Sequence, residues 1–168
     1  MFKDAHAAIK FAFRTLNKQI VKTSSINSMR GPSWGGMKPQ ELHAQAAMIM
    51  SKIERVVDVH GQAYLRAQYG REHEYGEHSR AIMNHLAKMI LATFPTGMHS
   101  QRGVEKLIIN YFGGSIGMSA IRCDMRCGSV RVNQYRDMVK AALDSVGKRA
   151  ERDVDIALRE SGLIEDVD

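Results

Sequence analysis

The sequence contains no long hydrophobic run. Its longest uninterrupted apolar stretch is Ala46 to Met50, whereas a membrane-spanning helix needs about 20 apolar residues. The first residues also lack the apolar block of a signal peptide. We therefore expect a cytoplasmic protein.

Cysteine is scarce as well. Cys123 and Cys127 lie four residues apart, and a disulfide between them would close too small a loop to stabilise a secreted fold. Two thiolates could contribute to a zinc site, but zinc needs four ligands and the sequence has no second cysteine pair. We expect both residues to pack as small apolar side chains between two helices, and a metal completed by distant histidines is the alternative.

The usual catalytic motifs are absent too. The sequence has no P-loop, no dinucleotide-binding glycine pattern, no serine elbow and no supported pair of carboxylates. His73 and His78 are five residues apart, about 140° around a helix, so they cannot share a metal on a regular helix. We expect His43, His60 and His85 to lie on polar helix faces or as satisfied core residues. The prediction is a protein with no catalytic residue, no metal and no cofactor.

The basic charge is concentrated in most of the chain. Lysine and arginine total 24 and aspartate and glutamate 18, which gives a net charge of +6. Residues 151–168 hold 2 basic and 7 acidic side chains, so residues 1–150 carry a net charge of +11. A basic body of this kind favours a polyanionic partner, and the acidic tail is either a solvated end or a contact for a basic partner.

The apolar residues recur at spacings of three and four in five separate segments, which is the pattern of one helix face. No segment alternates apolar and polar residues between hairpin turns, so we predict an all-α, compact multi-helix fold. Polar and glycine-rich stretches at residues 22–39 and 70–77 predict loops. The helices expected before residue 113 cover residues 5–16, 40–69 with an interruption near Gly61, 78–94 and 101–112.

Residues 115–147 predict a helix-turn-helix. Ser119 is expected to cap a first helix, Gly128 to lie in the turn and Ser129 to cap a second helix. The chain is thus divided into a helical body at 1–112 with the glycine-rich loop 22–39, the helix-turn-helix at 113–147, and an acidic helical tail at 148–168. The apolar faces of the two helices consist of Ile121 and Met125, and of Val132, Tyr135, Met138, Val139 and Ala142.

The polar residues of this segment are suited to double-stranded DNA. The N-terminal residues of the second helix must reach base edges in the major groove, where Arg reads guanine and Asn or Gln reads adenine. The predicted base contacts are therefore Arg131, Asn133 and Gln134. The predicted phosphate contacts, which give salt-dependent affinity, are Arg122, Arg126, Ser129, Arg136 and Lys140.

Two positions depart from the usual motif, which has a small residue in place of Arg122 and a glycine in place of Arg126. The glycine of this chain comes two residues later, at Gly128. The alternative interpretation is an ordinary helical hairpin whose basic residues are only solvated.

The order of these features resembles a known family. A small, basic, all-helical chain with a long helix through AQAAMIMSKIERVV and QAYLRAQYG, and a late helix-turn-helix in MSAIRCDMRCGSVRVNQYRDMVKAAL, is similar to the late-gene antitermination proteins Q of lambda-like phages, in particular the short branch typified by phage 21. The resemblance covers residues 40–147 and is one of organisation.

The resemblance implies a phage protein in the bacterial host. Such a protein binds DNA near a late promoter, engages paused RNA polymerase and allows later terminators to be read through, using a helix-turn-helix similar to the polymerase-proximal domain of a sigma factor. Arg30, Trp34 and Lys38 would then be contacts for polymerase or nascent RNA, because they combine charge with a stacking ring. A helix-turn-helix repressor or activator that binds an operator as a homodimer, and a helical interaction module without nucleic acid, are the alternatives.

Overall fold

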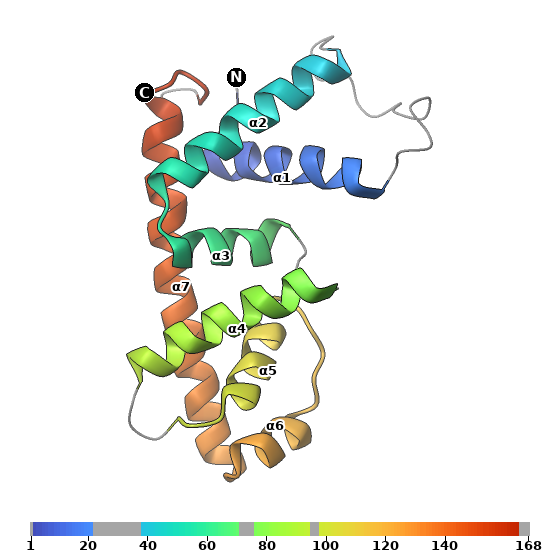
Figure 1. The fold of residues 1–168 in the computed structure, drawn as a ribbon. Coiled ribbons are helices and arrows are strands. Elements are labelled where there is room, and N and C mark those ends of the chain that lie inside the picture. Colours follow the sequence, from blue (N-terminus) through green and yellow to red (C-terminus); the bar gives the residue numbers. More distant parts are fainter. Residues whose placement is uncertain (1, 22–37, 71–75, 95–97, 165–168) are drawn as a thin grey trace. The chain divides into compact units, whose positions relative to one another are not determined.

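The computed structural model describes residues 2–21, 38–70, 76–94 and 98–164 (Figure 1). Every regular element in this part of the chain is an α-helix, and its isolated β-bridge pairs Phe2 with Ile164. The all-α prediction is therefore confirmed. The helices are α1 (Ala5–Val21), α2 (Pro39–Val56), α3 (Val59–Tyr69), α4 (Gly76–Thr93), α5 (Gln101–Tyr111), α6 (Met118–Met125) and α7 (Ser129–Arg159).

Residues 40–69, expected to form one long helix with an interruption near Gly61, form two helices. The break lies at Val57 and Asp58, whose backbones are extended, and not near Gly61, which is buried inside α3. Asp58 is the N-cap of α3, and its side-chain oxygen accepts the N–H of Gly61 at 2.7 Å. A carboxylate that satisfies a free N–H of the first turn favours the start of a new helix at this point.

The described residues form two compact units. One consists of residues 1–57 and 151–168, and the other of residues 58–150. This grouping differs from the division expected from the sequence, because residues 58–112 belong to the same unit as the predicted helix-turn-helix. In addition, α7 continues without a break past residue 147, where the sequence suggested a separate tail.

The unit formed by both ends of the sequence is built on α1 and α2. These two helices pack against each other through small and branched side chains. The Phe2 ring lies 5.2 Å from the Phe11 ring, and the Phe2 N–H donates to the carbonyl oxygen of Leu163 at 2.9 Å. The buried residues of α1 and α2 include Ala8, Ile9, Ala12, Ala46, Ile49 and Ile53.

The unit of residues 58–150 contains the segment with the predicted DNA contacts. In it α4 packs against both α3 and α5, and α6 packs against α5 (Figure 1). The Tyr111 hydroxyl donates to Asp144 Oδ1 at 2.6 Å, which ties α5 to α7. Burial, together with this hydrogen bond, holds the pKa of the Tyr111 phenol above its ordinary value. The fully buried core residues here include Leu65, Leu86, Ile90, Val104, Leu107, Ile108, Ile121 and Leu143.

Gly147 in α7 is required by the space available, since the Tyr64 ring lies directly over it. A Cβ at this position would come within 2.6 Å of Tyr64 Cε1 and 2.7 Å of its hydroxyl oxygen. Gly147→Ala should therefore lower the free energy of unfolding by about 1–3 kcal/mol through overpacking. In a Tyr64→Ala background the same change should raise it by up to about 1 kcal/mol, because alanine favours the helix. Urea denaturation of the wild type, the two single variants and the double variant gives the change in the free energy of unfolding in each background. A destabilising effect of Gly147→Ala in both backgrounds would contradict the prediction.

Candidate nucleic-acid interface

The helices α6 and α7 are joined by three residues, Arg126 to Gly128. Ile121 is the buried side chain of α6, with no exposed surface. On α7 the side chains of Val132, Tyr135 and Val139 are buried. These residues confirm the predicted inward stripe, while Met138 and Ala142 on the same stripe are only half-buried.

The starts of both helices differ from the prediction. The N-cap of α6 is Gly117, without a side-chain hydrogen bond, so Ser119 does not cap it. The first hydrogen bond of α7 runs from the Val132 N–H to the Gly128 carbonyl oxygen at 3.1 Å. Gly128 therefore occupies the cap position and Ser129 is already helical, because the cap is the residue whose carbonyl accepts the first helical bond.

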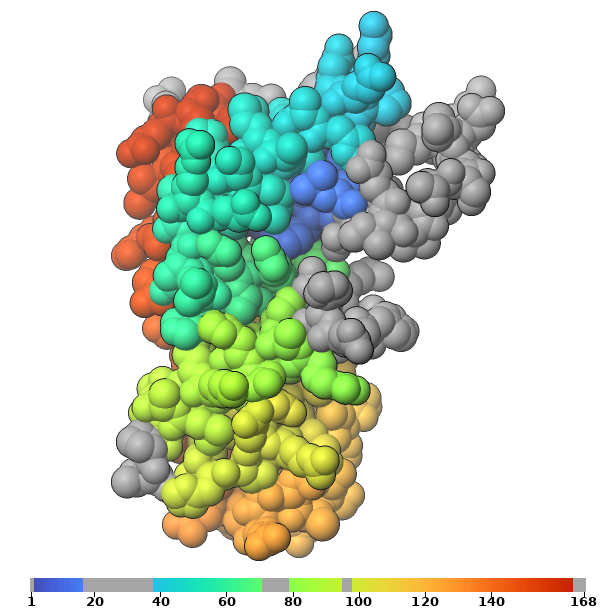
Figure 2. Space-filling view, viewed as in Figure 1, coloured from blue at the N-terminus to red at the C-terminus, as the bar shows by residue number. Residues whose placement is uncertain are grey.

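All eight predicted DNA contacts lie on the surface of this unit. They are exposed, and in Figure 2 α6 and the first part of α7, coloured orange, form the surface at the lower end of the view. The proposed base contacts are Arg131, Asn133 and Gln134, and the proposed phosphate contacts are Arg122, Arg126, Ser129, Arg136 and Lys140.

The side chains of α7 are sorted by their position around the helix. Asn133 and Gln134 lie on the face opposite the buried stripe. Arg131 lies at the edge of the buried stripe, because it is four residues before buried Tyr135. Arg136 contacts the carboxylate of Asp137 at 3.4 Å, and both side chains are more than half exposed. An exposed pair of this kind is weak and leaves the guanidinium able to meet a phosphate.

Arg126 has a left-handed backbone conformation, with φ 49° and ψ 42°. Its N–H donates to the carbonyl oxygen of Cys123 at 3.3 Å, and the N–H of Cys127 donates to that of Arg122 at 3.4 Å. This pair of bonds is the Schellman ending of a helix, in which the left-handed position is usually glycine. Arg126 thus stands where the usual motif has glycine, and the turn keeps the glycine-type backbone.

The same ending is found on two other helices of this chain, and both use glycine. Gly113 after α5 has φ 101° and Gly162 after α7 has φ 66°, each with the same two hydrogen bonds on the last turn. Among the described residues Arg126 is the one residue other than glycine with a positive φ. A side chain in this conformation costs about 1–2 kcal/mol, so a function of the guanidinium would explain why arginine is present.

We expect Arg126→Gly to raise the free energy of unfolding by about 0.5–1 kcal/mol. The gain is the relief of the left-handed strain, reduced by the greater freedom of glycine in the unfolded chain. Arg126→Lys keeps both the strain and the charge and should change stability by less than about 0.5 kcal/mol. Urea denaturation followed by circular dichroism measures both variants. A loss of stability in Arg126→Gly would show that the arginine side chain supports the fold.

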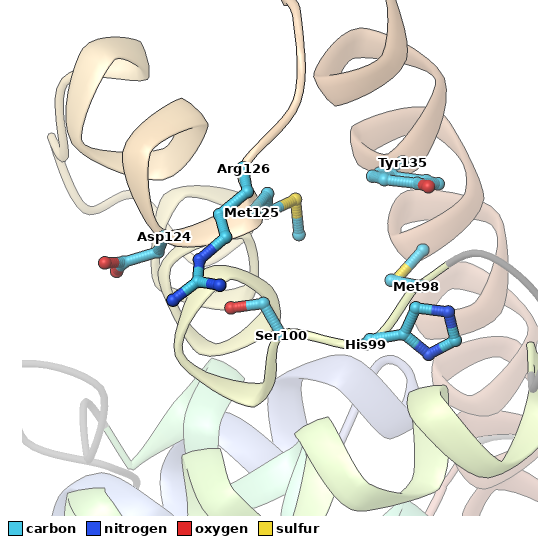
Figure 3. A pocket seen from close by; sticks show the side chains of 7 residues that line it. All are labelled: Met98, His99, Ser100, Asp124, Met125, Arg126 and Tyr135. Carbon is cyan, nitrogen blue, oxygen red and sulfur yellow. The ribbon is translucent and has the colours of Figure 1, made fainter.

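A hollow of about 430 Å³ lies beside Arg126, between the start of α5, the end of α6 and α7. Figure 3 shows Met98, His99 and Tyr135 on one side of it, and Arg126 with Asp124 and Met125 on the other. The carboxylate of Asp124 is paired with Lys106 Nζ at 2.6 Å. The hollow therefore combines an apolar wall with an exposed cation at its rim.

Gly103 of α5 makes room for this arrangement. A Cβ at Gly103 would collide with the Met125 side chain and would lie 3.2 Å from Ser100 Oγ. Ser100 is the N-cap of α5, and its hydroxyl oxygen accepts the Gly103 N–H at 3.1 Å. The missing side chain thus allows the last turn of α6 to lie close to the first turn of α5.

The cysteines and histidines do not form a metal centre among the described residues. Cys123 is exposed, so the expectation that both cysteines pack between the helices is wrong for Cys123, while Cys127 is half-buried. His60 Nδ1 and His85 Nε2 lie 3.0 Å apart and join α3 to α4. Within the described ranges no three His, Cys, Asp or Glu residues are grouped so that they could hold a metal ion.

The sequence reasoning missed two residues on the outward face of α7. Val130 is 73% exposed, and the Asp137 side chain is 70% exposed. Together with Asn133 and Gln134 they follow the spacing of three, four and seven that defines one helix face. This spacing can be read from the sequence, but neither Val130 nor Asp137 is among the predicted contacts. Of the predicted polymerase or RNA contacts, Lys38 is exposed just before α2, whereas Arg30 and Trp34 lie outside the described residues.

No helix in the described part of the chain is both long and apolar enough to cross a membrane. In comparisons with known proteins, no family model matches the chain, and neither a curated protein nor a solved structure matches it.

Proposed function

We propose that this protein is a DNA-binding transcription regulator that inserts the N-terminal half of α7 into the major groove. The observation that carries the proposal is the distribution of side chains on this helix. Val132, Tyr135 and Val139 are buried on one side, and the amides of Asn133 and Gln134 are exposed on the other. A recognition helix needs this division, because its inner face must be braced while its outer face meets base edges.

The cations around this face support the same function. Arg122 and Arg126 belong to α6 and its end, and Arg136 and Lys140 follow along α7, all exposed. Such positions are suited to the phosphates on both sides of a groove, which fix orientation and supply affinity without reading sequence. Arg131 is exposed beside the buried stripe, and its side chain is long enough to reach a guanine.

We further propose, on the resemblance to the Q proteins, that the regulator acts as an antitermination factor on RNA polymerase. A repressor or activator that binds an operator as a dimer is the second candidate. Purified polymerase separates the two, because only the antitermination function requires a stable complex with polymerase in the absence of free DNA. Co-sedimentation of the protein with core polymerase and with holoenzyme is the measurement, and absence from both fractions would favour the repressor or activator.

The DNA-binding function is tested by separating sequence reading from general affinity. We expect Arg131→Ala and Gln134→Ala each to cost about 1–3 kcal/mol on a duplex selected from a randomised pool, and much less on random duplex. Fluorescence anisotropy with both duplexes, alongside a thermal melt of each variant, measures the difference. Equal losses on both duplexes with an unchanged melt would mean that α7 does not read bases, and no binding to either duplex would overturn the proposed function.

A further inference from the structure

The first turn of α7 carries an apolar side chain that is mostly exposed to solvent. Val130 is the second residue of the helix and is 73% exposed, the highest value among the large exposed hydrophobic side chains that the structure describes. A β-branched residue is not favoured in a helix for its own sake. Ser129 and Arg131 beside it are also exposed, so Val130 stands out from a polar surface.

The position of Val130 aligns it with the proposed base contacts. Asn133 and Gln134 are three and four residues further along α7, and Asp137 is seven residues further. Residues at these spacings share one face of a helix, and all four are exposed. The face therefore presents, in order, an apolar group, two amides and a carboxylate.

Each of these groups matches a different feature of the major groove. Amides pair with adenine, a carboxylate accepts from the amino group of cytosine, and an apolar side chain contacts the 5-methyl group of thymine. We infer that Val130 is a specificity-determining residue that contacts the methyl group of a thymine next to the bases read by Asn133 and Gln134. This inference rests on the proposed DNA-binding function and adds to it a hydrophobic contact that is specific to thymine.

The methyl group can be removed from the DNA without any other change. The probe is a duplex selected from a randomised pool, in which each thymine is replaced in turn by deoxyuridine. Burial of one methyl group corresponds to about fourfold in affinity, so the wild-type protein should bind about fourfold more weakly when one particular thymine is replaced. Val130→Ala should bind the unmodified duplex more weakly by a similar factor and should be insensitive to deoxyuridine at that position.

Val59→Ala is the matched control. Val59 is the first residue of α3, as Val130 is the second of α7, and it is 63% exposed. Its substitution therefore removes the same atoms from a similar place in the first turn of a helix. This variant should keep the wild-type affinity and the wild-type response to deoxyuridine. Thermal melts should show that both valine variants fold as the wild type does.

The outcomes separate the inference from the function on which it rests. If the protein binds a selected sequence but Val130→Ala responds to deoxyuridine as the wild type does, the inference is wrong and the DNA-binding function stands. The same holds if no thymine in the selected site shows a methyl effect. If selection enriches no sequence and no duplex is bound, the proposed function fails and the inference with it.

Discussion

Replacing Arg122, Arg126, Arg136 and Lys140 together with glutamine should weaken binding to every DNA duplex, on the order of 10³-fold at 0.1 M salt. The four side chains are exposed around the outward face of α7, where each would displace a counterion from a phosphate. The logarithm of the binding constant falls by about 0.9 per contact for each tenfold rise in salt, so the slope should become less steep by about 3.6. Anisotropy titrations at several salt concentrations between about 0.05 and 0.2 M measure the affinity and its dependence on salt together.

The control for this prediction is a second set of four exposed cations elsewhere in the chain. Lys10, Arg14, Lys88 and Arg152 are exposed, and their replacement by glutamine lowers the net charge by the same amount. In both sets one arginine contacts a neighbouring aspartate, Arg136 in the first and Arg152 in the second. If both quadruple variants lose affinity equally, the total charge attracts DNA and the α6 and α7 surface is not the binding site.

Ile121→Ala should lower the free energy of unfolding by about 2–5 kcal/mol. Ile121 has no exposed surface and is the buried side chain of the eight-residue helix α6. A helix this short is not stable on its own, so it depends on packing. Removing three carbons from its one buried anchor leaves a cavity that the surrounding helices can close only in part.

Ile156 provides the comparison, because it is the same residue type with 49% of its surface exposed. Ile156→Ala should change the free energy of unfolding by less than about 0.5 kcal/mol. Ile121→Val, which removes one methyl group, should cost about 0.5–1.5 kcal/mol. Urea denaturation followed by circular dichroism gives all three values. A cost below 1 kcal/mol for Ile121→Ala would mean that α6 is held mainly by its ends and by Met125.

Spacing rules predicted the helices well wherever burial decides the structure. The inward stripe of Val132, Tyr135 and Val139 followed from positions three and four residues apart, since only one face of a helix can reach a core. The exposure of the polar residues between them followed from the same argument. The pattern therefore predicted which side chains are buried and which are exposed, whereas their role in binding DNA depends on the measurements described above.

Local hydrogen bonds were harder to predict than burial. The break between α2 and α3 depends on one carboxylate of Asp58, and the periodicity of apolar residues continues across it. The left-handed conformation of Arg126 could not be predicted, because propensity assigns that conformation to glycine and Gly128 stands two residues later. In both places a few hydrogen bonds outweigh the residue preferences on which sequence reasoning depends.

The grouping of residues 1–57 with residues 151–168 has a consequence for the order of folding during synthesis. The unit of residues 58–150 is continuous in sequence. All of its residues are therefore synthesised before Leu163 and Ile164, which pair with Phe2. At about 5–20 residues per second, the end of α7 is synthesised roughly 5–20 seconds after the end of α2. The segment with the proposed DNA contacts is thus synthesised in full before the unit that contains both ends of the sequence has all of its residues.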